Sequence, residues 1–166
     1  MIKLSEHTMP RNIASVSAII FGAVIGIYSS IFAPVPFALN PGLLFGLIAA
    51  LFSIIILHES IHGLIATLFG IKPFFGHKFP VVYVTFNERI PRNHFLIIAI
   101  TPFIILDVIF VLLFAGGCNR IYCYFCLVLN TAGSFGDIWI AIKLFRHKRG
   151  TVVQDLKTGF EVWQTE

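Results

Sequence analysis

Charged side chains are scarce in this sequence. Asp, Glu, Lys and Arg make up 12% of its 166 residues, whereas 57% are hydrophobic. Soluble domains usually carry about 25% charged residues. The composition therefore excludes a domain with an aqueous surface all round and indicates an integral membrane protein. The length is typical of a single domain, which we expect to span residues 1–166.

Cysteine is also scarce. Cys118, Cys123 and Cys126 cluster near one end of the last apolar segment. An odd number of cysteines with no distant partners argues against a disulfide framework, and no fourth ligand for a structural zinc is evident nearby. We interpret them as small apolar residues in or near a membrane helix.

Nucleic-acid binding is excluded as well, although the net charge is +4. The basic residues lie at the ends of apolar segments, where they set the topology of a membrane protein. The partners that we expect are the lipid bilayer and a membrane protein or peptide substrate.

Long apolar runs dominate the sequence. At about 1.5 Å per residue, a helix needs roughly 20 apolar residues to cross a hydrocarbon core of ~30 Å. Four segments meet this requirement: residues 13–33, 42–69, 94–115 and 121–145. The first is too long for the apolar part of a signal peptide. We therefore expect an all-α membrane protein, a bundle of about four transmembrane helices.

Local signals mark the ends of the second segment. Asn40 is a plausible helix cap, with Pro41 in the first turn, and Gly70 is a plausible stop. In the third segment, Pro102 is expected to kink the helix.

The segments between and after these helices are less decisive. Within the loop of residues 71–93, Phe79–Phe86 is rich in β-branched and aromatic residues. It favours a strand, with a turn at Asn87-Glu88 and a return at Arg89-Ile90, which makes a short β-hairpin. An irregular interfacial loop is the alternative. The tail of residues 146–166 is either a short strand or disordered.

Lysine and arginine counts predict the orientation in the membrane. The N-terminus, the 71–93 loop and the cluster after Phe145 hold nearly all of them, and the opposite side holds only Arg120. The positive-inside rule then predicts a multi-pass protein of the cell membrane with both termini in the cytoplasm.

Three ionisable residues interrupt the second apolar segment. His58 and His62 lie four residues apart and so share one face of a helix, with Glu59 beside them. This spacing allows two imidazoles to bind one zinc ion while Glu59 acts as a general base. Each charged residue in a bilayer costs roughly 2.5–3.5 kcal/mol, so three of them indicate a shared task. The alternative is a polar cluster that holds helices together.

A third zinc ligand is expected from another helix. His62 lies eight residues before Gly70, which is roughly 12 Å inside the membrane by the helical rise, and Asp137 lies at a matching distance before the basic cluster. Asp137 is therefore the preferred ligand. Asp107 is the rival, at a greater depth that helix tilt or the kink at Pro102 could offset.

Asn130, Ser134 and Asp137 share one helical face, where Gly133 and Gly136 allow close packing. Asn130 lies at about the depth of Asp107. It could hydrogen-bond that residue or bind the backbone of a substrate.

These motifs resemble a known family. The sequence His58-Glu59-Ser60-Ile61-His62, the later Asn130 with Ser134-Phe135-Gly136-Asp137, and the stretch from Ile90 to Phe103 are similar to the zincin peptidases found among small bacterial membrane proteins. The resemblance covers roughly residues 51–140. More distantly, the chain resembles the site-2 intramembrane metalloproteases, although Gly136-Asp137-Ile138 replaces their Leu-Asp-Gly motif. The resemblance implies proteolysis.

The sequence therefore predicts a zinc peptidase embedded in the membrane. In this prediction His58, His62 and Asp137 bind Zn²⁺, Glu59 is the catalytic base, and Asn130 contacts substrate. Two other functions fit the same residues: a metal-binding or metal-transporting protein without hydrolysis, and an inactive interaction protein stabilised by zinc.

Overall fold

The computed structural model describes residues 1–9, 13–32, 40–78, 81–156 and 159–164. Two compact units divide the chain. The first comprises Met1–Ile13, Glu59–Pro102 and Gly136–Glu166, and the second comprises Ala14–His58 and Phe103–Phe135.

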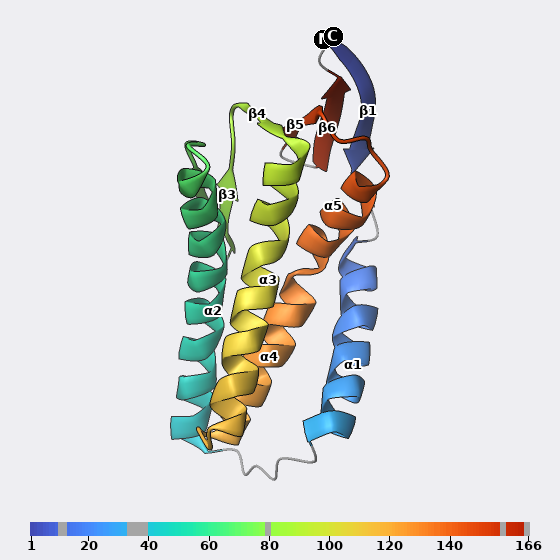
Figure 1. Ribbon diagram of the computed structural model, residues 1–166. Helices are drawn as coiled ribbons and strands as arrows, with labels where there is room; N and C mark the ends of the chain where they lie inside the picture. The colour runs from blue at the N-terminus through green and yellow to red at the C-terminus, as the bar shows by residue number, and fades with distance from the viewer. Residues whose placement is uncertain (10–12, 33–39, 79–80, 157–158, 165–166) are drawn as a thin grey trace. The chain divides into compact units, whose positions relative to one another are not determined.

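The described chain contains five helices and six strands, which occur in short groups along the sequence (Figure 1). In order they are β1 (Ile2–Thr8), α1 (Ile13–Phe32), α2 (Pro41–Leu68), β2 (Phe74–Lys78), β3 (Val81–Thr85), β4 (Arg89–Pro91), α3 (Arg92–Ala115), α4 (Arg120–Gly133), α5 (Phe135–Phe145), β5 (Thr151–Leu156) and β6 (Gly159–Gln164). The predicted all-α bundle is therefore wrong, because these residues form two sheets as well as helices.

The larger sheet joins three distant parts of the chain. Its four antiparallel strands lie in the order β1-β6-β5-β4. Val153 of β5 faces Val162 of β6 on one side and Ile90 of β4 on the other, and all three side chains are fully buried. The tail forms two strands because its apolar residues alternate with polar ones and so line one face of the sheet.

The smaller sheet is the hairpin of β2 and β3, in which Phe75 pairs with Val84. The strand predicted within Phe79–Phe86 is confirmed over Val81–Thr85, while residues 79–80 lie outside the described chain. The chain bends at Asn87-Glu88 as expected. The predicted return is wrong in its pairing, because β4 pairs with β5 rather than with β3.

A hydrophobic core holds the first unit together. It combines the sheet with the last turns of α2, the first turns of α3 and the face of α5 that carries Leu144. Its buried members are Ala66, Ile71, Phe86, Ile90, Phe95, Ile98, Leu144, Val153, Phe160 and Val162. The buried guanidinium of Arg92 donates from Nε to the carbonyl of Leu144 at 3.0 Å, which satisfies a carbonyl at the end of α5.

Among the described residues, fewer helices than expected are long and apolar enough to cross a membrane. In the described chain α2 and α3 are long and apolar enough, and α4 with α5 would add a third span only as a bent pair. The predicted helix over residues 121–145 is thus broken at Ser134, whose hydroxyl donates to the Asn130 carbonyl at 2.7 Å, next to Gly133. The helix predicted over residues 13–33 is present as α1, and the part of it tested as a membrane span, Phe21–Ser30, counts as a shorter apolar helix.

The predicted ends of α2 are confirmed. The helix begins at Pro41, and the Asn40 side chain accepts a hydrogen bond from the Leu43 N–H at 2.9 Å. At the other end Gly70 has a φ of +75°, and Ile71 donates to the Ala66 carbonyl at 2.9 Å. These bonds close the helix and leave its long apolar body intact.

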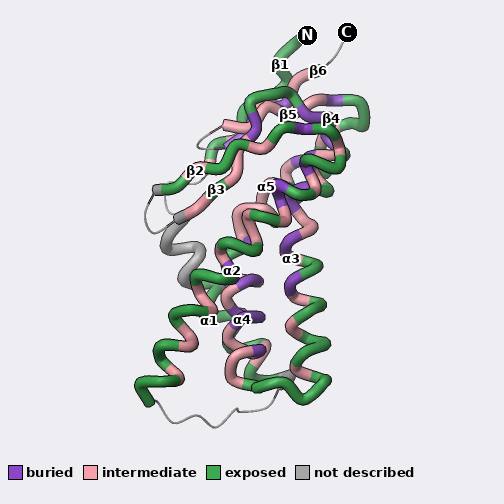
Figure 2. Tube along the Cα trace, turned by 90° about the vertical axis from the view of Figure 1, so that its left-hand side faces the viewer, coloured by how far each residue is buried: buried purple, intermediate pink, exposed green. Residues whose placement is uncertain are grey.

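Apolar side chains along α2 and α3 are largely uncovered. In the most apolar 18-residue stretch of each helix, only 11% of α2 and 22% of α3 are buried. Exposed positions recur along both helices (Figure 2). Such large exposed apolar surfaces fit a lipid environment.

Candidate metal centre

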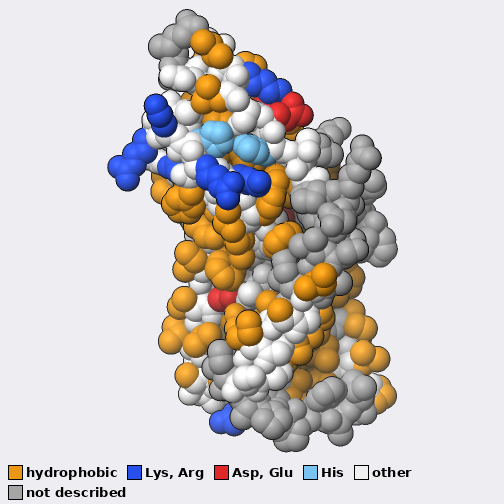
Figure 3. All heavy atoms as spheres, turned by 90° about the vertical axis from the view of Figure 1, so that its right-hand side faces the viewer, with side chains coloured by type: hydrophobic (Ala, Val, Ile, Leu, Met, Phe, Trp, Pro, Cys, Tyr) orange, Lys and Arg blue, Asp and Glu red, His pale blue; other side chains and the backbone are white. Residues whose placement is uncertain are grey.

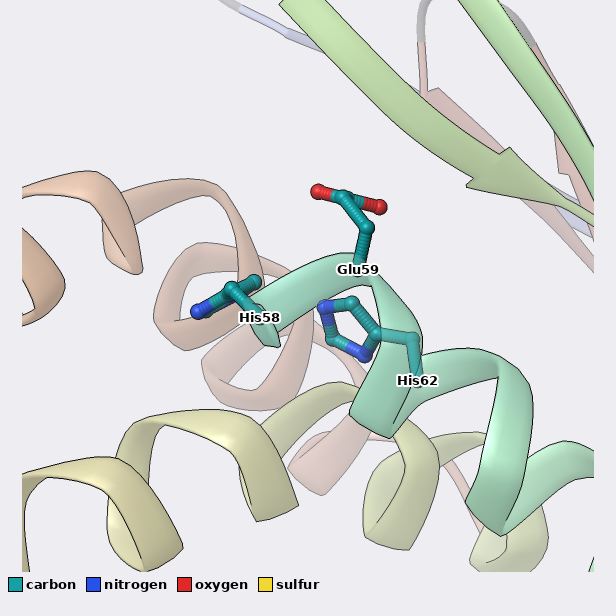
Figure 4. Close-up of side chains that lie close together, drawn as sticks. All are labelled: His58, Glu59 and His62. Atoms are coloured by element: carbon teal, nitrogen blue, oxygen red, sulfur yellow. The ribbon is translucent and has the colours of Figure 1, made fainter. Parts of the chain in front are cut away.

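One turn of α2 brings together the three residues that the sequence singled out. His58, Glu59 and His62 each offer a ligand atom, and these atoms lie within 4.8 Å of one another. Figure 4 shows the three side chains on the same helix, with the Glu59 carboxylate extending away from the two imidazoles. The cluster is local to a single helix, so its geometry follows from the four-residue spacing of the histidines.

Hydrogen bonding fixes the proton on the His62 ring. Its Nδ1 lies 2.8 Å from the carbonyl oxygen of Ile98, in α3. A carbonyl can only accept, so Nδ1 carries the hydrogen and a neutral ring has its lone pair on Nε2. This Nε2 lies 3.6 Å from Oδ2 of Asp137, in the first turn of α5. The structure thus places Asp137 beside His62.

His58 is oriented in the same way within the second unit. Its Nδ1 lies 3.0 Å from Oδ1 of Asn130. The Asn130 amide nitrogen donates to Asp107 at 2.9 Å and to the carbonyl of Phe103 at 3.3 Å, so the amide oxygen faces His58 as an acceptor. His58 therefore donates from Nδ1, which leaves the lone pair of a neutral ring on Nε2.

Asp107 has a different setting from Asp137. Its carboxylate accepts hydrogen bonds from Asn130, from the Thr131 hydroxyl at 2.6 Å and from the Tyr28 hydroxyl at 3.3 Å. The hydrogen bond between Asn130 and Asp107 was one of two roles expected for Asn130. The other role, in substrate binding, stays a prediction.

Glu59 faces a cavity in the first unit. Its Oε2 accepts a hydrogen bond from the backbone N–H of Val84, in β3, at 2.8 Å. The cavity has a volume of about 760 Å³, and Glu59, His62 and Asp137 all line it. The residues Tyr83, Val84, Thr85 and Phe86 line it too, so an extended strand lies beside the ionisable groups.

Sequence reasoning missed Asp155, which also lines this cavity. Its Oδ2 accepts hydrogen bonds from the Thr85 hydroxyl at 2.6 Å and from the Phe86 N–H at 3.3 Å. Burial raises the pKa of Asp155, and these hydrogen bonds partly offset that rise. The only signal was a carboxylate in an alternating apolar stretch of the tail, which reveals no partner by itself.

The residues of this centre fit zinc. Zinc in proteins binds imidazole nitrogen and carboxylate oxygen. Ligating histidines typically donate their second ring N–H to a carbonyl or another acceptor, which fixes the tautomer. His58 and His62 both have this arrangement, and Asp137 supplies a carboxylate beside His62.

The helices and this centre define a membrane-associated protein with a zincin-type cluster. Residues 51–152 match the family described as "Putative zincin peptidase". The match covers more than half of the chain, which therefore belongs to that family. Searches of curated proteins and of solved structures found no match.

Proposed function

We propose that this chain is a zinc-dependent peptidase of the membrane. It hydrolyses peptide bonds of a membrane-associated protein or peptide near the cytoplasmic side of the bilayer. The observation that carries the proposal is the cavity that Glu59, His62 and Asp137 line together beside β3. Membership of the zincin family supports hydrolysis over metal transport or storage.

His58 and His62 would hold zinc through Nε2, with the Asp137 carboxylate as the third ligand. The hydrogen bonds of their Nδ1 atoms to Asn130 and Ile98 keep both rings in the orientation that binding requires. Bound there, zinc would polarise a peptide carbonyl and lower the pKa of a water towards about 7.

Glu59 is the proton carrier in this proposal. Its carboxylate takes a proton from the attacking water and passes it to the nitrogen of the leaving amine. The hydrogen bond from the Val84 N–H to Oε2 orients the carboxylate in the cavity. Glu59 therefore needs no role as a metal ligand.

Strand β3 is suited to hold the substrate. It pairs with β2 along one edge, and its residues line the cavity. An extended substrate segment can align with the backbone of such a strand, which positions one peptide bond near Glu59.

The sheet also supports the proposed orientation. Strands β1, β4, β5 and β6 belong to one sheet, so the N-terminal segment, the segment before α3 and the tail share one side of the bilayer. These segments carry most of the basic residues, which favours a cytoplasmic location for that side.

The test compares the wild type with Glu59→Gln in detergent. We expect the variant to keep zinc, measured per chain by mass spectrometry of the metal, and to lose cleavage of a membrane-peptide mixture by about 10²-fold or more. Glu88→Gln is the matched control, because Glu88 bonds only the Lys72 N–H in the hydrogen bonds seen for its side chain. Cleavage by Glu59→Gln at the wild-type rate would overturn the mechanism. A wild type that binds zinc but cleaves nothing would favour the non-hydrolytic alternative.

A further inference from the structure

A second cavity lies at the turn between α5 and β5, apart from the metal centre. Its volume is about 500 Å³. The turn supplies four consecutive lining residues with basic side chains, Arg146, His147, Lys148 and Arg149, and no Asp or Glu is among the described residues that line the cavity. A pocket with this lining attracts anions.

The cations around this pocket are not neutralised within the described chain. Among the ion pairs of the described residues, none includes Arg146, Lys148 or Arg149. Their side chains are exposed to solvent. Three exposed cations within four positions repel one another, so a bound anion would stabilise the turn.

The turn itself is ordered by its own hydrogen bonds. The Thr151 hydroxyl donates to the carbonyl of Lys148 at 3.0 Å, and Gly150 adopts a φ of +93° that other residues rarely reach. The N–H of His147 donates to the Leu144 carbonyl at 3.0 Å. The basic side chains therefore project from a defined turn rather than from an irregular tail.

Two histidines lie beside these basic side chains. His7 and His147 lie with their Nε2 atoms 3.0 Å apart, and the Ser5 hydroxyl lies 3.1 Å and 3.3 Å from these two atoms. Figure 3 shows histidine side chains together at the surface, with lysine and arginine side chains gathered around them. Besides burial, Arg92 lowers the pKa of His147, and His147 and Lys143 lower that of His7, as expected where positive charge accumulates.

We infer that the pocket of Arg146, Lys148 and Arg149 binds a phosphate group. Arginine forks match the oxygens of phosphate, and three cations suit its charge better than that of a single carboxylate. The turn follows directly after the end of α5, which with α4 forms a bent candidate span. Phosphate-bearing head groups of anionic lipids lie at that depth, and basic clusters beside membrane helices recognise them. Soluble phosphate is the other source of the same chemistry.

The test measures binding to the full chain in neutral detergent by native mass spectrometry. The probes are phosphatidylglycerol, phosphatidylcholine and inorganic phosphate. Arg146→Gln/Arg149→Gln is compared with Lys72→Gln/Arg120→Gln, which removes the same charge elsewhere. Each cation near an anionic head group raises the binding affinity about fivefold. We therefore expect the first variant to bind phosphatidylglycerol on the order of 20-fold more weakly than the wild type, and the control to bind it within about twofold of the wild type.

The arms of this test separate the sources. Saturable binding of phosphatidylglycerol that inorganic phosphate does not displace assigns the site to a lipid head group. Binding of inorganic phosphate alone, lost in the same variant, assigns it to a soluble phosphate. Equal weakening in both double variants, equal binding of phosphatidylcholine, or no binding of either phosphate probe would overturn the inference. Circular dichroism of each variant verifies that the helices and sheets are retained, and none of these results depends on peptidase activity.

Discussion

The Nδ1 atom of His58 lies 3.0 Å from Oδ1 of Asn130, and this contact decides which nitrogen of the ring is available to a metal. Asn130 can present its oxygen because its amide nitrogen is committed to Asp107 and to the Phe103 carbonyl. Asp107 thus sets the tautomer of His58 through Asn130, although it does not contact the imidazole in these hydrogen bonds.

The first prediction removes this contact. Asn130→Ala should weaken zinc binding about 10- to 100-fold, because His58 loses the acceptor that fixes its ring and tautomer. Zinc affinity would be measured by competition with a chelator. Asn119→Ala is the control, since Asn119 caps α4 through the N–H groups of Ile121 and Tyr122 and does not bond either histidine. Unchanged zinc affinity in Asn130→Ala would show that the contact does not prepare His58 for the metal.

The second prediction distinguishes the two aspartates. Asp137→Ala should lower the zinc content as severely as His58→Ala, because Asp137 is the carboxylate 3.6 Å from His62. Asp107→Ala should lower stability more than zinc content, because it removes the carboxylate that accepts from Asn130, Thr131 and Tyr28, and a buried donor that loses its only partner costs about 1–3 kcal/mol. Zinc per chain and thermal unfolding in detergent would be measured for each variant. Full zinc in Asp137→Ala together with zinc loss in Asp107→Ala would move the third ligand to α3.

Local spacing was enough to predict the clustering of His58, Glu59 and His62, since a single helix fixes their geometry. The caps of α2 were predictable for the same reason: Asn40 and Gly70 act on their own neighbours in the chain. Hydropathy identified α2 and α3 as candidate spans because it sums a property over many residues.

The larger sheet was not predictable from such local patterns. Strand β4 has three residues and pairs with β5, about 60 positions later, and β1 pairs with β6 across nearly the whole chain. Pairing over such distances depends on tertiary packing rather than on propensity. The break at Ser134 was also missed, because a run of apolar residues continues on both sides of it. Asp155 was missed because its partners, Thr85 and Phe86, lie on a distant segment.

The third prediction tests Asp155 as a positioning residue. Asp155 holds Thr85 and Phe86, which follow Val84, and Val84 in turn holds the carboxylate of Glu59. Asp155→Ala should lower kcat on the order of tenfold through misplacement of Glu59, with zinc content unchanged. Asp155→Asn keeps one acceptor oxygen and should recover part of the loss.

The control for this prediction is Gln154→Ala, the neighbouring position on β5. A drop in zinc content that parallels the drop in kcat would contradict a positioning role. Equal activity of the alanine and asparagine variants would show that the hydrogen bonds from Thr85 and Phe86 do not matter to catalysis.

The fourth prediction concerns the pH dependence of stability at the histidine pair. The pKa values of His7 and His147 are both lowered, chiefly by burial; His147 and Lys143 add to the effect on His7, and Arg92 adds to that on His147. The unfolded chain therefore takes up protons first as the pH falls below about 6.5. The free energy of unfolding should fall over that range and level off below the pKa values of the folded state. The geometry also predicts a loss of stability at low pH, because two Nε2 atoms 3.0 Å apart can share one proton but cannot each hold one.

His147→Gln removes one member of this pair and should flatten that part of the pH dependence. Thermal unfolding in detergent would be followed from pH 7.5 to pH 5.5 for the wild type, for His147→Gln and for His77→Gln, whose imidazole is exposed. Effects common to all three proteins, such as protonation of the metal centre, cancel in the differences. We expect the unfolding midpoint of His147→Gln to fall less than that of the wild type, and that of His77→Gln to fall equally. Parallel curves for all three would mean that the pair does not contribute to the acid sensitivity of the fold.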